Sequence, residues 1–229
     1  ENVDVDTAAA RAVKVIPVHG RNASAVAELA IGLMLSEARD IARADASVKH
    51  GGWRKDFGGP GDEIGGSTVG LIGFGHVGRE LAKRLRGFDV RLLVADPYVD
   101  NETLALHHAE RTDLDSLFRQ SDFVHVVARL TSETERMVTA RHFELMKPTA
   151  YFVNTARSRL VDNDALYEAL AAQRIAGAAL DVFDTEPLPA ESPWRTLDNL
   201  TFTTHFGGDT LTTNLRSARL VAEAIRRLT

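Results

Sequence analysis

Hydrophobic and polar positions along the chain predict strands that alternate with helices over most of its length. From residue 69 onward, short apolar runs recur, and segments with helical periodicity separate them. The apolar runs predict strands at 69–72, 90–95, 122–127, 150–153, 177–181 and 200–203, and the periodic segments predict helices near 101–109, 113–119, 141–146 and 163–172. Strands that alternate with helices imply an α/β fold with a doubly wound parallel sheet, whose ligands lie at the carboxyl ends of the strands.

The two ends of the chain follow other patterns. Residues 1–12 are typical of a short helix, residues 13–18 of a strand, and residues 211–228 of a final amphipathic helix. A polar, glycine-rich stretch that begins at Gly51 and runs to Gly66 is the best candidate for a loop or arm.

A long helix is expected to begin at Asn22 or Ser24. Its buried side is expected to carry the apolar residues Val26, Leu29, Ala30, Leu33 and Ile41. Gly32 in the middle of this helix costs ~1 kcal/mol relative to Ala. We therefore expect close packing at Gly32 against another helix or subunit.

Three glycines follow the apolar run 69–72 with the spacing Gly-x-Gly-x-x-Gly. This arrangement predicts a strand, a tight turn and a helix. Gly73 would permit the turn, Gly75 would let a pyrophosphate approach the backbone, and Gly78 would let the helix pack closely on the strand. The phosphates would lie at the positive N-terminus of the helix. Glycines in turns are common, so the spacing alone does not establish a nucleotide site.

Asp96 strengthens the interpretation of the glycine turn. It ends the apolar run 90–95, close to the ~20-residue separation at which an acidic residue accepts hydrogen bonds from the adenosine ribose. A carboxylate at this position would also repel a 2′-phosphate, which favours NAD over NADP. Asp96 could instead form a turn before Pro97, but that explanation does not account for its distance from the glycines.

Charged and ionisable residues follow three of the predicted strands. Arg157 comes after the strand at 150–153, Glu186 after the strand at 177–181, and His205 after the strand at 200–203. Singly, each has an ordinary explanation, as a surface charge, a turn residue before proline, or one of eight histidines. Since all three would meet at one edge of a parallel sheet, we expect them to form a site.

Composition and charge exclude several other classes of function. The chain has 229 residues, a formal net charge of -5 and no cysteine. An acidic chain without a basic face disfavours a nucleic-acid partner, and the lack of cysteine excludes disulfides and zinc–cysteine sites. No apolar run is long enough for a membrane span and no metal site is predicted. These features are consistent with a cytoplasmic protein.

Five segments, in order, resemble a known family. They are Asn22-Ala-Ser-Ala-Val-Ala-Glu28, Gly73 to Gly78, Asn154 to Leu166 with Arg157 and Val161-Asp162, Ala179-Leu180-Asp181-Val182-Phe183 through Glu186-Pro187, and Thr204-His205. Together they resemble the D-isomer-specific 2-hydroxyacid dehydrogenases, which include phosphoglycerate, glycerate and formate dehydrogenases. The resemblance implies a Rossmann-type NAD-binding domain at 21–210, the end of a flavodoxin-like substrate domain at 1–20, and a C-terminal helix at 211–229 that packs back toward that domain. The rest of the substrate domain would be absent, in which case cofactor binding should survive and turnover should be weak.

The resemblance also implies roles for individual residues. Arg157 would grip the substrate carboxylate and carbonyl oxygen, Glu186 would orient the histidine, and His205 would be the acid/base. The implied cofactor-binding residues are Gly73, Gly75, His76, Val77, Gly78, Asp96, Ala128, Thr155, Ala156, Arg157, Asp181, His205 and Gly208. Among these, Asp181 would hold the nicotinamide carboxamide. The resemblance further implies a 2-hydroxy or 2-keto acid as substrate, and a homodimer formed through the 22–50 helix and the arm after it.

The chain departs from the pattern of the family at several positions. Ser158 replaces a usual glycine, Arg129 a proline, Val127 a histidine and Trp194 a leucine. Arg129 could be a second contact for an anionic substrate or a solvated surface charge. The rival function is that of a non-catalytic dinucleotide sensor or corepressor with the same fold, although Arg157, Glu186 and His205 together speak against it. The sequence does not choose among phosphohydroxypyruvate, hydroxypyruvate, glyoxylate and bulkier keto acids.

Overall fold

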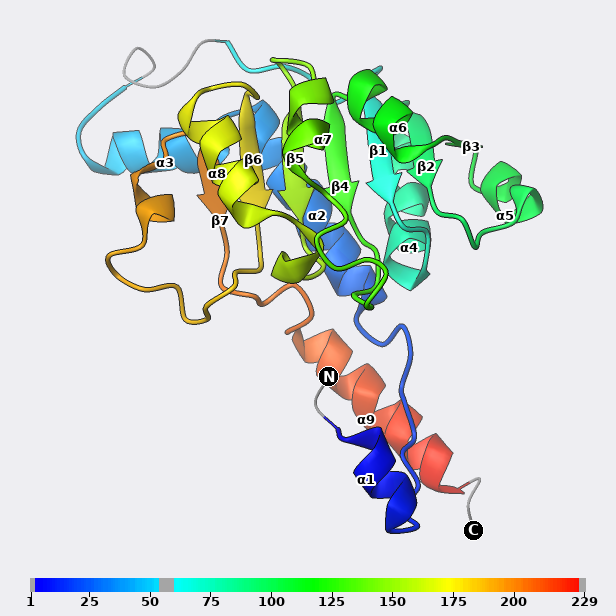
Figure 1. Cartoon of the computed structure of the whole chain (residues 1–229). Coiled ribbons are helices and arrows are strands. Elements are labelled where there is room, and N and C mark those ends of the chain that lie inside the picture. The colour runs from blue at the N-terminus through cyan, green and yellow to red at the C-terminus, as the bar shows by residue number, and fades with distance from the viewer. Residues whose placement is uncertain (1–2, 54–59, 227–229) are drawn as a thin grey trace.

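A single parallel sheet organises the structure, a computed structural model that describes residues 3–53 and 60–226 (Figure 1). Within these residues the sheet has seven strands in the order β3-β2-β1-β4-β5-β6-β7. The strands are β1 (Thr68–Ile72), β2 (Arg91–Ala95), β3 (Ala109–Arg111), β4 (Phe123–Val126), β5 (Tyr151–Asn154), β6 (Gly177–Leu180) and β7 (Leu200–Phe202). The chain runs outward from β1 to β3 and then returns to β4 beside β1. This reversal creates the crevice in which doubly wound sheets bind their ligands.

Helices cover both faces of the sheet. On one face, α2 (Ala23–Ala38), α4 (His76–Leu85) and α5 (Asn101–Leu106) share a buried apolar cluster with β1 and β2. On the other, α6 (Leu114–Gln120), α7 (Ala140–Leu145) and α8 (Asn163–Ala171) pack on β4, β5 and β6. Neighbouring strand residues enter opposite clusters: Phe152 packs on the second face and Val153 on the first. The fully buried strands are why the sequence shows continuous apolar runs instead of alternation.

The structure corrects one expected strand and one expected helix. Residues 13–18 do not form a strand: Val13, Val15 and Ile16 are exposed, and no described strand pairs with them. Their backbone therefore lacks the partner that would make an extended apolar segment part of a sheet. The helix expected near 101–109 stops at Leu106, and Ala109 begins β3, whose three residues are too short for a periodic signal.

The helix expected over residues 22–50 is two helices. It begins as predicted, with Asn22 as the N-cap of α2, but α2 ends at Ala38 and α3 (Ile41–Lys49) follows. Asp40 separates them with φ 52° and ψ 33°, a left-handed conformation that no helix continues through. As a result, Ile41 is 53% exposed instead of buried. Gly32 is also exposed, and a Cβ added there would meet nothing within 4 Å, so close packing at Gly32 does not occur within the described chain.

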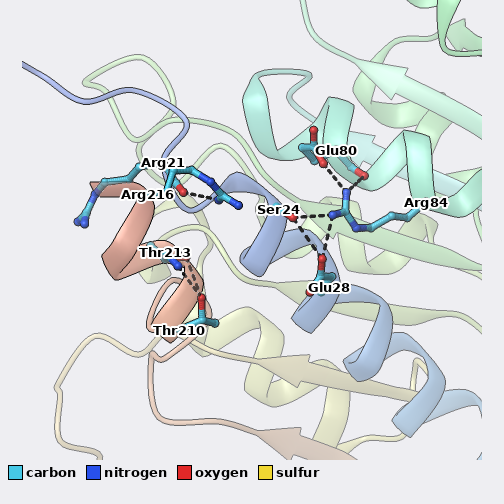
Figure 2. A network of polar contacts seen from close by, with 8 residues as sticks. All are labelled: Arg21, Ser24, Glu28, Glu80, Arg84, Thr210, Thr213 and Arg216. Carbon is cyan, nitrogen blue, oxygen red and sulfur yellow. Dashed lines mark hydrogen bonds and ion pairs between the residues drawn. The ribbon is translucent and has the colours of Figure 1, made fainter. Parts of the chain in front are cut away.

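A guanidinium holds α2 against α4 (Figure 2). Arg84 of α4 donates through Nη2 to Ser24 Oγ at 2.6 Å and to Glu28 Oε1 at 2.9 Å, both on α2. Its Nη1 also forms an ion pair with Glu80 one helical turn earlier. These contacts tie the start of α2 to the helix that follows the glycine turn.

The C-terminal helix α9 (Leu211–Arg226) leaves the sheet and projects with α1 (Val5–Ala10) from one end of the molecule (Figure 1). Arg216 Nη1 donates to the backbone oxygen of Arg21 at 2.7 Å, and Arg21 Nη1 donates to Ser217 Oγ at 3.1 Å. The start of α9 is therefore tied to the segment that enters α2. The domain boundaries expected from the sequence, and the packing of α9 on a substrate domain, stay predictions.

Candidate active site

The glycine turn has the geometry that the sequence predicts. Gly73 adopts φ +94°, which a residue with a side chain rarely adopts, and a Cβ there would lie 2.7 Å from Ala128 Cα. A Cβ on Gly78 would lie 3.0 Å from Gly73 O, so α4 packs directly on the turn. Ala128 follows β4, and its backbone forms the other wall of this close approach. The turn therefore belongs to the crevice between β1 and β4.

The N-terminus of α4 is suited to hold an anion. Gly75 is its N-cap, and among the described residues no side chain accepts a hydrogen bond from this end of the helix. A Cβ on Gly75 would meet nothing within 4 Å, so the space above it is open. The first amides of a helix, here those of His76 and Val77, carry partial positive charge and lack partners within the helix. These features fit the pyrophosphate of a dinucleotide.

Asp96 connects the end of β2 with the glycine turn. Its Oδ2 accepts from the Phe74 amide at 2.7 Å, and its Oδ1 accepts from the Tyr98 amide at 2.8 Å. Asp96 therefore shapes the turn before Tyr98 and also contacts the glycine turn, while its contact with an adenosine ribose stays a prediction. It borders a cleft of about 670 Å³, together with Arg111 and Met137. The cleft lies where the adenosine end of a dinucleotide would be expected.

Asn154 shapes the turn that presents Arg157. Its Oδ1 accepts from the Ala156 amide at 3.0 Å, and its Nδ2 donates to the Arg157 oxygen at 3.1 Å. The Arg157 guanidinium donates through Nη1 to the Ala156 oxygen at 2.7 Å and lies in an exposed position. Asn154 is buried, so its two hydrogen bonds hold the turn from inside the protein while the Arg157 side chain remains accessible.

Thr155 is supported by a buried histidine that the sequence analysis did not single out. His125 lies within β4, and its Nε2 is 3.0 Å from Thr155 Oγ1. Burial lowers the pKa of His125 to about 3, so the ring is neutral near pH 7. His125 therefore fixes the hydroxyl beside the expected nicotinamide position without adding charge there. Its only sequence signal is a polar residue inside an apolar run.

His205 and Glu186 are in direct contact. Nδ1 of His205 lies 2.6 Å from Glu186 Oε2, while Oε1 accepts from the Phe183 amide at 2.8 Å. An ionised carboxylate only accepts hydrogen bonds, so Nδ1 carries the proton of this contact and Nε2 is left for a ligand. His205 has φ +56°, in the left-handed region, so the turn aims its side chain in a direction that an ordinary strand end would not.

Opposing effects set the charge of Glu186. Partial burial raises its pKa, but the Phe183 amide, the contact with His205 and the charge of Arg157 outweigh burial. The net pKa of Glu186 is below its ordinary value. The carboxylate is therefore ionised near neutral pH and can hold the imidazole in one orientation.

Asp181, which the family resemblance places at the nicotinamide carboxamide, is buried in the structure. It is 2% exposed, and its carboxylate accepts from Thr203 Oγ1 at 2.6 Å, the Phe206 amide at 3.1 Å and the Gly207 amide at 3.0 Å. Asp181 therefore anchors the turn that carries His205. Its contact with a nicotinamide carboxamide stays a prediction. Gly208 completes this turn, where a Cβ would lie 2.5 Å from Asn22 Nδ2.

The three candidate catalytic side chains line one cleft of about 470 Å³. Arg157, Glu186 and His205 reach it from the ends of β5, β6 and β7, as the sequence predicted. Arg129 does not line this cleft, whereas Arg159, paired with Glu135, does. Arg159 was missed because a second arginine two residues after the first gives no signal of its own.

Comparison with known proteins identifies the family. Residues 31–207 match the family profile described as "D-isomer specific 2-hydroxyacid dehydrogenase, NAD binding domain". The chain belongs to this family. The matched range includes the glycine turn, Asp96 and the three strand ends that form the cleft. Residues 31–207 therefore form an NAD-binding domain of this family.

Individual relatives are similar to this chain over nearly its whole length. It is 40% identical over 226 residues to a D-3-phosphoglycerate dehydrogenase of Archaeoglobus fulgidus, across 98% of this chain and 42% of the relative. It is 41% identical over 213 residues to a hydroxypyruvate reductase of Thermotoga maritima, across 92% of this chain and 68% of the relative. The holo crystal structure of Rhodotorula graminis D-mandelate dehydrogenase matches with a TM-score of 0.90 and 30% identity, across 98% of this chain and 68% of that one. The chain thus spans less than half the length of the first relative.

Neither a membrane-spanning helix nor a cluster of metal ligands occurs within the described residues. Across 3–53 and 60–226, no helix is long and apolar enough to cross a membrane. In the same described residues, no three His, Cys, Asp or Glu side chains gather in a way that could hold a metal ion.

Proposed function

We propose that the protein interconverts a D-2-hydroxy acid and its 2-keto acid with NAD as the cofactor. Arg157, Glu186 and His205 are the proposed catalytic residues. The observation that carries the proposal is the 2.6 Å contact of Glu186 with His205, in the same cleft as Arg157. A cation, a proton donor and a carboxylate that orients the donor are the groups that reduction of a keto acid requires.

The roles of the three residues follow from the charge that develops during reduction. When bound, NADH would supply the hydride for the carbonyl carbon, and negative charge would then build on the carbonyl oxygen. His205 donates a proton to that oxygen through Nε2, while Arg157 binds the carboxylate and stabilises the developing charge. Glu186 keeps the ring oriented and stabilises its protonated form. In the oxidation direction, neutral His205 accepts the hydroxyl proton.

The fit of NAD rests on the crevice between β1 and β4. Gly73, Gly75 and Gly78 provide a turn on which the pyrophosphate can lie, and the amides of α4 face it. Asp96 borders the cleft at the adenosine end, where its carboxylate favours a ribose hydroxyl over a 2′-phosphate. NAD is therefore the proposed form of the cofactor. The contacts of His76, Val77, Ala128, Thr155, Ala156, Asp181 and Gly208 with it are proposed from the family resemblance.

The proposed substrate class is a small 2-hydroxy or 2-keto acid, in keeping with the names of the relatives. A homodimer through α2, α3 and the arm that follows is proposed as well. Its support is apolar side chains left exposed on this segment: Ile41 and Val48 of α3, and Trp53 after it. Exposed apolar residues gathered on one segment are typical of interfaces. Measurement of the molar mass in solution tests the dimer, and the cytoplasmic location expected from the sequence stays a prediction.

Replacement of His205 tests the catalytic assignment. His205→Ala should abolish NADH consumption with a panel of 2-keto acids and leave the Kd for NADH nearly unchanged, because the imidazole supplies the proton and not the main cofactor contacts. His108→Ala is a matched control: His108 is exposed and has φ 54°, close to the 56° of His205, so both variants place alanine in a similar backbone conformation. His108→Ala should keep wild-type activity.

Two outcomes would contradict the proposal. Wild-type turnover in His205→Ala would remove the histidine from the reaction. If the wild-type protein binds NADH but consumes none with any 2-keto acid, the rival function of a dinucleotide sensor replaces the enzymatic one.

A further inference from the structure

A cluster of three polar side chains borders the candidate cleft. Ser158, which follows Arg157, is 6% exposed and donates its hydroxyl hydrogen to Asp184 Oδ1 at 2.6 Å. Asn163, the first residue of α8, directs Nδ2 at both oxygens of Asp184, each at 3.0 Å. The same Nδ2 lies 2.8 Å from Ser158 Oγ. We call Ser158, Asn163 and Asp184 the serine cluster.

The serine cluster joins two loops that carry candidate catalytic residues. Arg157 lies directly before Ser158 in the loop after β5. Asp184 lies in the loop after β6, between Phe183 and Glu186, and the Phe183 amide holds Glu186 Oε1. The bond from Ser158 to Asp184 therefore connects the loop that carries Arg157 with the loop that carries Glu186, and Ser158 and Asp184 both line the cleft.

Support of α8 alone does not account for the cluster. The N-terminus of α8 is already capped by Asp162, whose Oδ1 accepts from the Ala165 amide at 3.2 Å. Asp162 is further held by an ion pair with Arg136. Asn163 instead directs its side chain away from the helix axis, toward Ser158 and Asp184 in the loops.

We propose that Ser158 and Asp184 are positioning residues that fix Arg157 and Glu186 relative to each other. The proposal rests on the proposed function, since it concerns the geometry of the same cleft. A hydroxyl bonded to a carboxylate forms a short, charge-assisted hydrogen bond that resists displacement of either loop. Small displacements of groups that hold a substrate reduce the rate strongly, because the reacting atoms must be aligned within a fraction of an ångström. A glycine at position 158, usual in the family, could not make this bond.

Kinetics of Ser158→Ala, Asp184→Ala and the double variant test the proposal. Each single variant should lower kcat/KM for the 2-keto acid roughly tenfold. The loss should appear in kcat and in the KM for the keto acid, while the KM for NADH stays unchanged, because the cluster lies on the substrate side. The kcat/KM of the double variant should be no lower than that of the less active single variant, since both changes break the same bond. Ser158→Thr, which keeps the hydroxyl, should retain most of the activity.

Ser67→Ala is the matched serine control. The Ser67 hydroxyl is buried and makes no hydrogen bond within the described residues, so its removal should leave all kinetic constants unchanged. Thermal unfolding of every variant separates positioning from loss of the fold. If Asp184→Ala does not fold, Asp184→Asn replaces it, because it keeps the shape of the side chain and removes the charge.

Amide hydrogen exchange supplies a readout that needs no turnover. The Phe183 amide, bonded to Glu186, should exchange faster in Ser158→Ala than in Ser67→Ala, because the loop after β6 loses its tether. If the wild-type protein is inactive with all keto acids but Ser158→Ala still shows this faster exchange, the proposed function is refuted. The link that Ser158 and Asp184 make between the two loops would still be supported. Unchanged exchange and unchanged kinetics in Ser158→Ala, or losses that add fully in the double variant, would overturn the positioning role.

Discussion

Gly75→Ala tests where the dinucleotide lies, because it adds one methyl group at the N-terminus of α4. In the structure this methyl group would meet no protein atom within 4 Å. Gly75 has φ -73° and ψ -154°, so its φ is not in the left-handed region that favours glycine. The methyl group would therefore be accepted by the fold. It would nevertheless occupy the space through which a pyrophosphate approaches the backbone.

The expected effects on stability and on binding differ in size. At an N-cap, alanine is less favourable than glycine by up to ~1 kcal/mol. For a chain of this length that lowers Tm by about 2–4 °C. A methyl group forced against a bound phosphate costs ~1–3 kcal/mol, by analogy with an overpacked core. Converted with ~1.4 kcal/mol per factor of ten, the Kd for NADH should rise about 5- to 150-fold.

Fluorescence titration with NADH, combined with thermal unfolding, measures both effects. Gly32→Ala is the matched control, since a Cβ on Gly32 also meets nothing within 4 Å. It should leave the Kd for NADH unchanged and stabilise α2 by ~1 kcal/mol. Loss of stability in Gly32→Ala would instead indicate that another subunit packs there. Gly73→Ala should impair folding and binding together, because its φ is +94° and its Cβ would lie 2.7 Å from Ala128 Cα.

One result would refute the reasoning about the cofactor. If Gly75→Ala binds NADH as tightly as the wild-type protein, the pyrophosphate does not approach Gly75. The crevice between β1 and β4 would then not be the cofactor site in the form proposed.

Two further predictions concern carboxylates. Glu186→Gln should lower kcat for keto-acid reduction by roughly 10²-fold or more with little change in the Kd for NADH, since His205 loses the charge that orients it; steady-state kinetics with wild-type-like kcat would contradict this. Glu37 is buried in α2, and burial raises its pKa despite a neighbouring arginine. The folded state therefore binds the Glu37 proton more tightly than the unfolded state does. The stability of the wild-type protein should therefore fall as pH rises from the ordinary value of 4.5 through the raised pKa, and denaturant titrations of Glu37→Gln should show a flatter profile over that range.

The sheet was predictable because its strands are buried on both faces. Each central strand appears in the sequence as an apolar run, and the helices between strands show helical periodicity, so element type and order follow directly. The errors occurred where local pattern does not decide the structure. An apolar segment at 13–18 had no partner strand, β3 was too short to be distinguished, and Asp40 interrupted a helix that its neighbours could have continued.

The residues of the candidate site could be predicted from the sequence, but most of the contacts that hold them in place could not. Arg157, Glu186 and His205 follow three strands, and parallel topology alone brings strand ends to one edge. The contacts that hold them join residues far apart in the chain, such as Ser158 with Asp184. No periodicity records such pairs, because each is created by two loops that meet only after the sheet has formed. The same reason explains why Arg159 lines the cleft and Arg129 does not.

The turn after β7 depends on buried support more than the sequence suggests. His205 has φ +56°, a conformation that costs of order 1–3 kcal/mol for a residue with a side chain. The carboxylate of Asp181 offsets this cost by accepting hydrogen bonds from the Phe206 and Gly207 amides directly after it. A Cβ on Gly207 would lie 2.8 Å from Asp181 Oδ2, so glycine is required for the carboxylate to come this close. A Gly-Gly pair close to a histidine suggests flexibility, but here Gly207 allows the approach of the Asp181 carboxylate, whose hydrogen bonds hold the turn after His205.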